Sequence, residues 1–579
     1  MASAKRGTLL IGIDFGTTFT GVSWLLCKEK ALPGQPEVVT RWPSNLSRNS
    51  DRQKVPSKIH YNPTTGEISW GYNIPTDVEP IEWFKLLLLE PEDLQDHLRS
   101  SYHIRVARCM VQGLGKGAVE VVGDYLGVLW KHIMGEIQTE KGRNLILGTP
   151  IHVVLTVPAI WKDYARERMR HASDRAGILN SRTAGETTLS FISEPEAAAL
   201  ATIPDLDDRG DLEVDDSFVV VDAGGGTVDV ISYKVKSLEP LVVTECVEGD
   251  GALCGATFLD ERFVSSMIKS IGFGEWKCMG KTDIKKLVNN EWEHGIKCDF
   301  NGSSRPWTVD LPNGTRRGQV TLSAEDVRQI FNSVLPQIHT LVGGQLQAVV
   351  EKTQKYPKFV ILVGGFGRCP FIFKSLEQRL GSITEVLQGR GERPWSSICR
   401  GATLSGAMGR GLTRQAVQVR TRIARMNYGW DFIEPYIEGV HNQRDKIWDE
   451  LRGCWMADNQ MEWVIRRGQD ISTEEAKSYI YDESFSLKQT GYQPCALQIY
   501  TCTEMVPRCR VDERVQKLAE FSFSTPVPVE QLPKRKTNGP EHYKFEYDIN
   551  MKVSGAALEL SIMAGNTEIA AKSISVTYD

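Results

Sequence analysis

The sequence contains no run of 18 or more apolar residues, so we expect no membrane-spanning helix. The apolar run nearest the N-terminus, Leu9–Ile13, is shorter than the apolar segment of a signal peptide and is closed by Asp14. We therefore expect a cytoplasmic protein. Lys534-Arg535-Lys536 resembles a minimal nuclear signal and leaves access to the nucleus open, with a merely charged loop as the alternative.

Positive charge is not in excess, because 68 Lys and Arg stand against 73 Asp and Glu. A protein that holds a nucleic acid backbone needs a cationic surface, so we expect no nucleic acid partner. The twelve cysteines contain no C-x-x-C pair in a chain of 579 residues. Without an export signal, we expect reduced thiols rather than a disulfide framework or a zinc site.

The common nucleotide-binding motifs are also missing. Gly113-Leu-Gly115-Lys116-Gly117 lacks the first glycine of a phosphate loop and has Gly117 where Ser or Thr belongs. We interpret it as a plain loop. No G-x-G-x-x-G follows a strand with a matching acidic residue, which disfavours a dinucleotide enzyme.

Three apolar segments instead end in acidic or glycine-rich turns. They are Thr8–Ile13 before Asp14–Thr18, Phe218–Val221 before Asp222–Thr227, and Phe359–Val363 before Gly364–Gly367. A fourth strand, His152–Val157, precedes a charged helix, and this alternation predicts an α/β fold. The first two turns share one plan about two hundred residues apart, which indicates an internally duplicated fold whose two lobes face one cleft.

The residue types in the two acidic turns suit a phosphate chain and its metal. Glycine lets backbone amides approach a phosphate closely. Thr17, Thr18 and Thr227 can add hydroxyl donors. Asp14, Asp222 and Asp229 can hold magnesium, directly or through its waters. For either hairpin alone, a polar turn without a ligand is the alternative.

The composition changes near residue 411. Beyond it, apolar residues recur at period two, as in Tyr543, Phe545, Tyr547 and Ile549, and again in Leu558, Leu560 and Ile562 on the other side of Gly555. This pattern predicts antiparallel strands. We predict a nucleotide-binding domain over residues 1–410, a linker over 411–427 and a β-rich domain over 428–579.

As a set, the motifs resemble the actin-like ATPase superfamily and, within it, the seventy-kilodalton heat-shock protein (Hsp70) family over residues 7–410. The first three motifs are Gly12-Ile-Asp14-Phe-Gly16-Thr17-Thr18, Asp222-Ala-Gly224-Gly225-Gly226-Thr227-Val-Asp229 and Leu362-Val-Gly364-Gly365-Phe-Gly-Arg368. Two more, Thr156-Val157-Pro158-Ala159 and Glu194-Pro195-Glu196-Ala197-Ala198-Ala199, separate heat-shock chaperones from sugar kinases and actin.

The resemblance implies a role for each matching position. Asp14, Asp222 and Glu194 would hold magnesium, mainly through water, and with Thr227 would form the catalytic centre. Lys85 would orient the attacking water, with a surface lysine as the alternative interpretation. The nucleotide, ATP or ADP, would be bound by Gly16, Thr17, Thr18, Gly224, Gly225, Gly226, Asp229, Gly364, Gly365 and Arg368, with Glu293 and Lys297 near the purine and ribose.

Some positions depart from the family pattern. Phe366 replaces a small hydroxyl residue and would stack on adenine or crowd it. Ala256 and Thr257 stand where the family has acidic residues, and Trp395 interrupts a late acidic motif. Near the C-terminus, segments such as Met461–Arg467 resemble strands of the family's peptide-binding domain, and we expect no counterpart of the family's helical lid.

We therefore expect an atypical, monomeric heat-shock-type chaperone that binds Mg·ATP between two lobes and hydrolyses it slowly. Its partners would be protein clients and cochaperones. A catalytically weak nucleotide sensor or scaffold with one fixed protein partner is the alternative. A carbohydrate kinase of the same superfamily fits less well, because the Glu194–Ala199 pattern points elsewhere.

Overall fold

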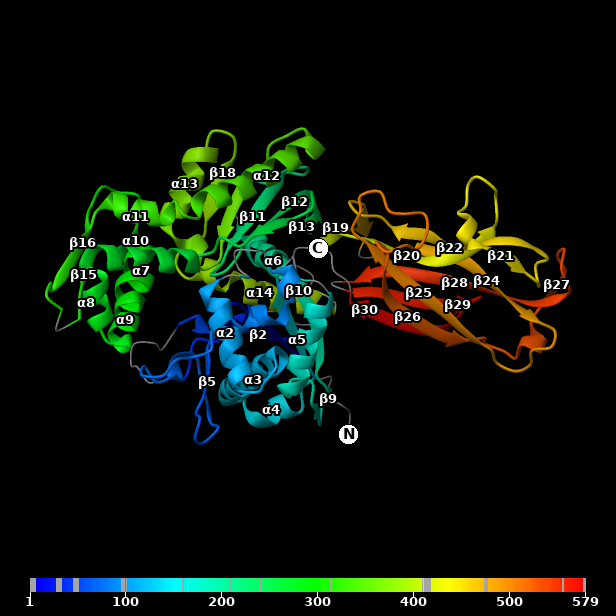
Figure 1. The fold of residues 1–579 in the computed structure, drawn as a ribbon, viewed down its shortest axis with the longest axis horizontal. Helices are drawn as coiled ribbons and strands as arrows, with labels where there is room; N and C mark the ends of the chain where they lie inside the picture. Colours follow the sequence, from blue (N-terminus) through cyan, green and yellow to red (C-terminus); the bar gives the residue numbers. More distant parts are fainter. Residues whose placement is uncertain are drawn as a thin grey trace. The chain divides into compact units, whose positions relative to one another are not determined.

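The chain divides into two compact units, Met1–Gln418 and Val419–Asp579. Each unit is described by itself below (Figure 1). The computed structural model describes residues 7–27, 34–44, 52–94, 99, 101–158, 161, 163–207, 211–239, 241–312, 315–408, 410, 418–472, 477–554 and 557–575. Of the predicted features, Ala159, Gly555 and residues 411–417 of the linker lie outside these ranges.

The first sheet of the N-terminal unit carries the first acidic hairpin. Its strands run in the order β10 (Thr188–Ser193), β7 (Ile151–Val157), β1 (Thr8–Phe15), β2 (Phe19–Cys27) and β3 (Glu37–Val38), with β4 (Lys54–Pro56) also on β2. β10, β7 and β1 are parallel, and β2 turns back antiparallel to β1. β1 and β7 are almost wholly buried, as strands covered on both faces are.

The second sheet repeats this plan. Its strands run in the order β18 (Glu385–Gln388), β17 (Phe359–Val363), β11 (Ser217–Ala223), β12 (Val228–Leu238) and β13 (Leu241–Glu245), with β14 (Asp250–Ala252) also on β12. β18, β17 and β11 are parallel, and β12 is antiparallel to β11. The predicted duplicated, two-lobed α/β fold is confirmed.

Two helices join the lobes. α6 (Glu194–Asp207) follows β10 yet contacts β11 and β12, whereas α14 (Arg393–Met408) follows β18 yet packs on β1, β2 and β7. The helices cross closely, since a Cβ built on Gly401 of α14 would lie 1.7 Å from the carbonyl oxygen of Ala197. The run of alanines after Glu196 thus serves the contact between the lobes.

The remaining elements of this unit cover the sheets or form small hairpins. The helices are α2 (Tyr102–Gly113), α3 (Ala118–Lys141), α4 (Arg143–Leu147), α5 (Asp163–Arg175), α7 (Thr257–Ile271), α8 (Phe273–Cys278), α9 (Lys281–Leu287), the π-helical segment Val288–Ile296, α10 (Lys297–Asp299), α11 (Ala324–Phe331), α12 (Leu335–Thr353) and α13 (Pro370–Leu380). The short strands are β5 (Ile59–Tyr61), β6 (Ile68–Trp70), β8 (Ser181–Arg182), β9 (Gly185–Glu186), β15 (Trp307–Asp310) and β16 (Gln319–Leu322). Three-residue to five-residue 3-10 turns cover Gly71–Asn73, Phe84–Leu88, Pro91–Asp93 and Phe366–Arg368.

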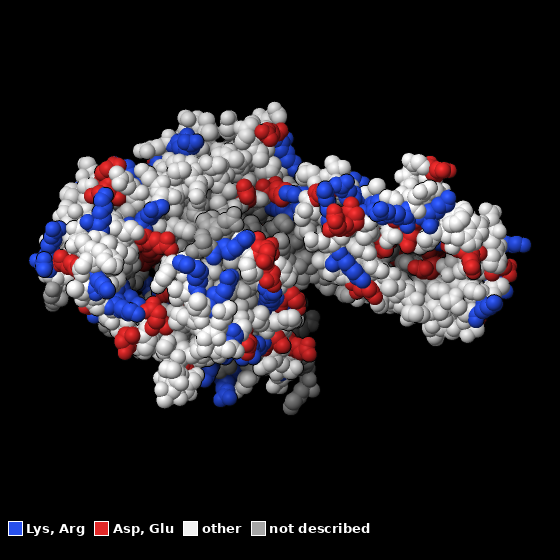
Figure 2. Space-filling model, viewed as in Figure 1, with Lys and Arg blue, Asp and Glu red and all other residues white. Residues whose placement is uncertain are grey.

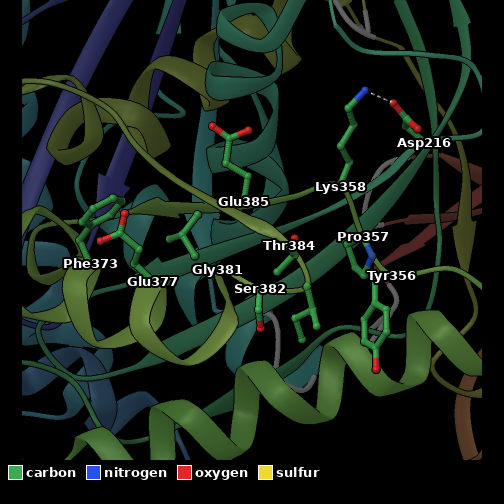
Figure 3. Close-up of a pocket in the computed structure, with 12 residues that line it drawn as sticks. Asp216, Tyr356, Pro357, Lys358, Phe373, Glu377, Gly381, Ser382, Thr384 and Glu385 are labelled. Carbon is green, nitrogen blue, oxygen red and sulfur yellow. Dashed lines mark hydrogen bonds and ion pairs between the residues drawn. The ribbon is translucent and has the colours of Figure 1, made fainter.

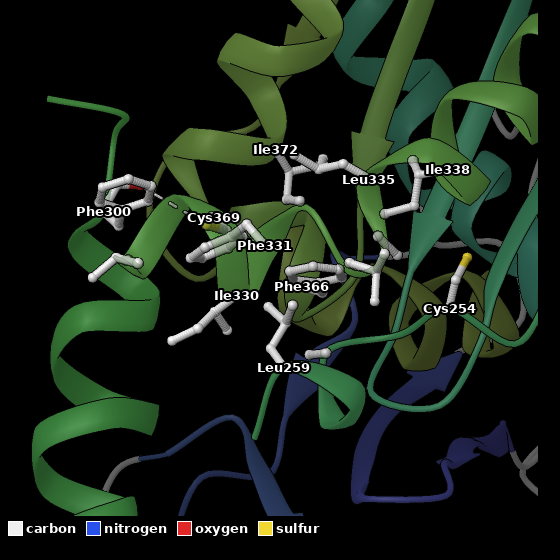
Figure 4. Close-up of a cluster of buried hydrophobic side chains, with 14 of the residues drawn as sticks. Cys254, Leu259, Phe300, Ile330, Phe331, Leu335, Ile338, Phe366, Cys369 and Ile372 are labelled. Atoms are coloured by element: carbon white, nitrogen blue, oxygen red, sulfur yellow. Dashed lines mark hydrogen bonds between the residues drawn. The ribbon is translucent and has the colours of Figure 1, made fainter. Parts of the chain in front are cut away.

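The core of the second lobe is apolar and rich in aromatic rings (Figure 4). Phe331 stacks on Phe300 and on Phe366, and Leu259, Ile338 and Ile372 belong to the same cluster. Phe366 is 3% exposed, so its ring supports the lobe from inside. The interpretation that Phe366 stacks on adenine is wrong.

The C-terminal unit is built from strands, as predicted. One sheet has the order β21 (Lys446–Asp449), β22 (Cys454–Ile465), β20 (Asn427–Pro435), β25 (Pro494–Cys502) and β26 (Gln516–Ser524). The other has β24 (Lys477–Ser486), β28 (His542–Ser554), β29 (Ala557–Ala564) and β30 (Thr567–Ser575), with β27 (Lys534–Arg535) on β28. A further pair joins β19 (Gln418–Ile423) to β23 (Asp470–Ser472).

The two sheets of this unit share one core. Trp430, Ile499 and Phe521 of the first sheet belong to the same buried cluster as Phe545 and Ile549 of the second. All seven residues predicted at period two on β28 and β29 are buried, which confirms that alternation reflects one face turned to the core.

The sequence also predicted no membrane-spanning helix, no disulfide framework and no broad cationic surface. Within the described ranges, no helix combines the length and apolarity needed to cross a membrane. All twelve cysteines are free thiols. On the face seen in Figure 2, blue and red side chains are interspersed over the N-terminal unit, and no broad cationic surface is visible there.

Candidate functional site

The first hairpin turns at Gly16. The Gly16 amide donates to the Phe19 carbonyl at 3.1 Å, and a Cβ on Gly16 would lie 2.5 Å from that oxygen. Ser57, next to β4, fixes the turn from outside, because its hydroxyl donates to the Gly16 carbonyl and its amide to the Thr18 carbonyl. No sequence pattern indicated this role for Ser57, which lies far from the turn along the chain.

The second hairpin turns at Gly224, whose amide donates to the Thr227 carbonyl at 2.9 Å. Asp222 and Asp229 lie opposite each other on β11 and β12. The segment before α7 clamps the turn, since the amide and the hydroxyl of Thr257 both donate to the Gly225 carbonyl. Thr257, noted above only as a departure from the family, thus holds the turn through a hydroxyl.

The two hairpins meet. A Cβ built on Gly225 would lie 2.1 Å from Thr18 Oγ1, and one on Gly226 would lie 3.5 Å from Thr17 Oγ1. The third turn joins them, because a Cβ on Gly364 would lie 2.5 Å from Asp222 Oδ1. Gly364 has φ +86°, a conformation that favours glycine. Three glycine-containing turns therefore converge, as a cradle for a phosphate chain requires.

Four buried carboxylates and two buried lysines surround this point: Asp14, Glu194, Asp222, Asp229, Lys54 and Lys85. Lys85 donates to Glu194 Oε1 at 2.7 Å, and Lys54 is paired with Asp14 Oδ2. Thr156 donates to the other oxygen of Asp14 at 3.3 Å. Both carboxylates of the first lobe are therefore partnered by a lysine.

Lys85 is 1% exposed, so the interpretation as a surface lysine is wrong. Its ammonium lies 5.7 Å from the ring centre of Phe15 and 5.2 Å from that of Trp161. These contacts, with the bond to Glu194, place one defined cation at the floor of the site.

Among the carboxylates of the site, Asp222 has the surroundings that oppose its negative charge most strongly. It is 3% exposed, and its Oδ1 has no hydrogen-bond partner. Burial, with the nearby charges of Glu194, Asp229 and Asp14, raises the pKa of Asp222 well above its usual range. Burial likewise raises the pKa of Glu194, although Lys85 opposes the shift. An acidic cluster with an unused oxygen suits a hard divalent cation, which would relieve this repulsion.

The residues expected around the nucleoside form two pairs of contacts. Glu293 and Lys297, one turn apart where the π-helical segment passes into α10, are joined at 2.5 Å, and Lys297 also bonds Asp260 at 2.9 Å. Burial raises the pKa of Asp260 to about 6 despite Lys297. Arg368 pairs with Glu392 at 2.9 Å and lies over the ring of Trp395. Gly365 lies against that same ring.

A pocket of about 780 Å³ opens at the other end of the second sheet, where its parallel strands begin (Figure 3). Asp216, Lys358 and Thr384, which line it, stand just before β11, β17 and β18. Ligands of open parallel sheets bind beyond the carboxyl ends of the strands, where Asp222 and Gly364 lie. We therefore assign the site to the hairpins rather than to this pocket.

The duplicated sheets and the converging glycine turns define the class of actin-like nucleotide-binding ATPase folds. The family model described as Hsp70 protein matches residues 138–421. The chain is similar to mouse heat shock 70 kDa protein 12A, with 22% identity over 77% of this chain and 75% of the relative. It is 21% identical to human heat shock 70 kDa protein 12B over 89% and 84% of the two chains. It is also 27% identical to chaperone protein DnaK of Thermoplasma volcanium over 48% and 43%.

These matches support a divergent member of the Hsp70 family, with the nucleotide-binding fold of that family.

Proposed function

We propose that the N-terminal unit binds Mg·ATP between its hairpins and hydrolyses it slowly. The observation that carries this proposal is the buried, unbonded Asp222 Oδ1 beside three converging glycine turns. The turns offer backbone amides to the phosphates, and Thr17, Thr18 and Thr227 add hydroxyl groups. Magnesium would be held by Asp222, Glu194 and Asp14, mainly through water.

The proposed reaction is in-line transfer of the terminal phosphoryl group to water. Magnesium supplies positive charge to the phosphates when it is bound. Lys85 orients the attacking water, and Glu194 fixes the position of the Lys85 ammonium. Little covalent work falls to the protein, because positioning and charge carry the effect.

Calorimetry with ATP and ADP, each with magnesium and with a chelator, tests the site. We expect binding that depends on magnesium and that weakens at least about tenfold in Asp222→Asn. Single-turnover release of phosphate, measured without added sugar, separates an ATPase from a carbohydrate kinase. Wild-type protein that binds neither nucleotide would end the proposal.

The chaperone role concerns the C-terminal unit. We propose that this β-rich unit, roughly residues 428–579, binds protein clients, with residues 411–427 as the linker. Two observations support this proposal. The strand segments occur in the same order as in the peptide-binding domain of the Hsp70 family, and the chain is similar to members of that family. We expect the protein to suppress aggregation of a thermally unfolded reporter enzyme, with an ATP dependence that Asp14→Ala removes.

A second candidate is a nucleotide sensor or scaffold that holds one fixed partner. Exposed apolar side chains on and beside β21 favour it, since Trp448 and Trp455 form a ring pair at 51% and 50% exposure. Such a protein would bind ATP without preventing aggregation of unrelated clients. Equal suppression with ATP, with ADP and in Asp14→Ala would instead indicate client binding that ATP does not drive.

We propose a cytoplasmic monomer with access to the nucleus. Lys534 and Arg535, in β27, and the neighbouring Lys536 are all exposed, which leaves this basic group open to an import receptor. Microscopy of a tagged chain, with and without replacement of all three by Ala, tests the nuclear share. Light scattering tests the monomer, and cochaperone binding is tested by titration with a purified nucleotide exchange factor.

A further inference from the structure

A row of three residues crosses the first sheet beneath the hairpin. Asp14 on β1 lies opposite Gly21 on β2, and Gly21 lies opposite Lys54 on β4. Residues opposite each other on neighbouring strands project from the same face of a sheet. Because Gly21 has no side chain, the stem of Lys54 passes over it and the ammonium reaches Asp14 two strands away.

The passage over Gly21 is close. A Cβ built on Gly21 would lie 3.1 Å from both Cγ and Cε of Lys54. Lys54 is 5% exposed, and its charge acts on Asp222 of the second lobe as well as on Asp14. A side chain that only filled space over Gly21 would need no charge, and burying an ammonium is unfavourable unless it is paired, as it is here with Asp14.

The distribution of charge shows what this ammonium can do. Each carboxylate that the first lobe contributes has its own lysine, Lys54 for Asp14 and Lys85 for Glu194. In the second lobe, Asp222 keeps an unbonded oxygen. A divalent cation therefore fits closest to Asp222, with Glu194 and Asp14 reaching it through water, and the two lysines of the first lobe add fixed positive charge to the same cradle.

We propose that Lys54 is a phosphate-positioning residue of the first lobe, whose ammonium, held by Asp14, contacts the phosphates of the bound nucleotide. The inference rests on the proposed nucleotide function. It assigns to Lys54 the positive charge that makes affinity rise with the number of phosphates on the ligand. It predicts that Lys54 contributes little to adenosine binding and increasingly more to binding of AMP, ADP and ATP.

Calorimetry on the full chain with adenosine, AMP, ADP and ATP, each with magnesium, tests this gradient. We expect Lys54→Met to weaken ATP and ADP binding at least about tenfold, as loss of a charge-assisted hydrogen bond does, and adenosine binding less than about twofold. The matched control is Lys269→Met on the exposed surface of α7, which should bind all four ligands as the wild type does.

A structural role would give a different pattern. If Lys54 only braced β4, all four ligands would lose affinity equally, in step with the melting temperature, and the inference would be overturned. A second variant, Lys54→Ala, allows chemical rescue, which a purely structural role would not show. Ethylammonium should restore part of the ATP affinity of this variant, and tetramethylammonium at equal ionic strength should not. Absence of any such rescue would also count against the inference.

The variant Gly21→Ala tests the position of the Lys54 ammonium without removing its charge. The added methyl group displaces the stem of Lys54, so we expect ATP affinity to fall about threefold relative to adenosine. Wild-type protein that binds no nucleotide would defeat the proposed function itself. Wild-type binding with an unchanged ratio of ATP to adenosine affinity in all three variants would defeat only the role of Lys54.

Discussion

Gly225 of the second hairpin lies against Thr18 of the first, so closely that a Cβ on Gly225 would come within 2.1 Å of Thr18 Oγ1. Real Cβ contacts essentially never fall below 3.0 Å, so Gly225→Ala must move one hairpin away from the other. We expect Mg·ATP affinity to fall about tenfold or more in calorimetry, because both turns must present their amides to one phosphate chain.

The matched control is Gly343→Ala on α12, where a Cβ would meet no heavy atom within 4 Å. Replacing a helical glycine by alanine should stabilise the protein by roughly 0.5–1 kcal/mol and leave nucleotide affinity unchanged. If Gly225→Ala bound ATP as tightly as this control does, the two turns would not share a ligand.

Lys85 and Glu194 form a buried ion pair, and the proposed function makes Lys85 the residue that orients the attacking water. Lys85→Met should slow single-turnover phosphate release by a factor on the order of 10²–10³, because one preorganised charge is lost. It should also lower the free energy of unfolding by about 3 kcal/mol, since Glu194 stays buried without its partner.

The double variant Lys85→Met with Glu194→Gln separates the two effects. Removing both charges should restore most of the stability, measured by urea denaturation, and none of the phosphate release. Recovery of activity together with stability would show that Lys85 acts only as a structural partner.

Much of the fold could be predicted because its strands carry local signals. The apolar runs before Asp14, Asp222 and Gly364 became β1, β11 and β17, and each turn contains the glycines that its close approach demands. The repeated plan of the two turns predicted the duplicated lobes. Period-two alternation predicted β28 and β29 for the same reason, since one face of each strand meets a core.

The residues that sequence reasoning missed reach the site from a distance along the chain. Lys54 lies on a strand of three residues, too short to show any periodicity, and its role depends on the absence of a side chain at Gly21. Ser57 and Thr257 hold the hairpins through hydrogen bonds to backbone carbonyls, which no local pattern encodes. The two alternatives for Phe366, stacking on adenine or crowding it, stayed open because a motif comparison locates a residue along the chain but does not say which way its ring turns.

The position of Phe366 in the core separates stability from binding (Figure 4). Phe366→Ala should lower the free energy of unfolding by about 3–5 kcal/mol, as loss of a buried aromatic ring does. Phe366→Leu keeps most of the apolar volume and should cost clearly less. Calorimetry at a temperature where the variants remain folded should show adenosine affinity close to that of the wild type. A large loss of adenosine affinity in stable Phe366→Leu would instead place the ring against the base.

His152 on β7 makes the stability of the N-terminal unit depend on pH. The ring is buried between Thr188 and Ser190, whose hydroxyl oxygens lie 2.8 and 3.0 Å from its two nitrogens. Arg410, which also donates to Thr188, lies beside it. Burial, with the charge of Arg410 second, lowers the pKa of His152 from 6.5 to about 4.

Between these two pKa values the unfolded chain holds a proton on His152 that the folded chain does not. The contribution of His152 to stability is therefore intact above pH 6.5 and is lost as the pH falls toward 4. We expect it to amount to about 2 kcal/mol between pH 7.5 and pH 5, at 1.4 kcal/mol per unit of pKa. His152→Asn cannot take up a proton, so its free energy of unfolding should decline less over this range by that amount. Urea denaturation of both proteins at the two pH values measures the difference, and parallel declines would show that the ring titrates equally in the folded and unfolded chain.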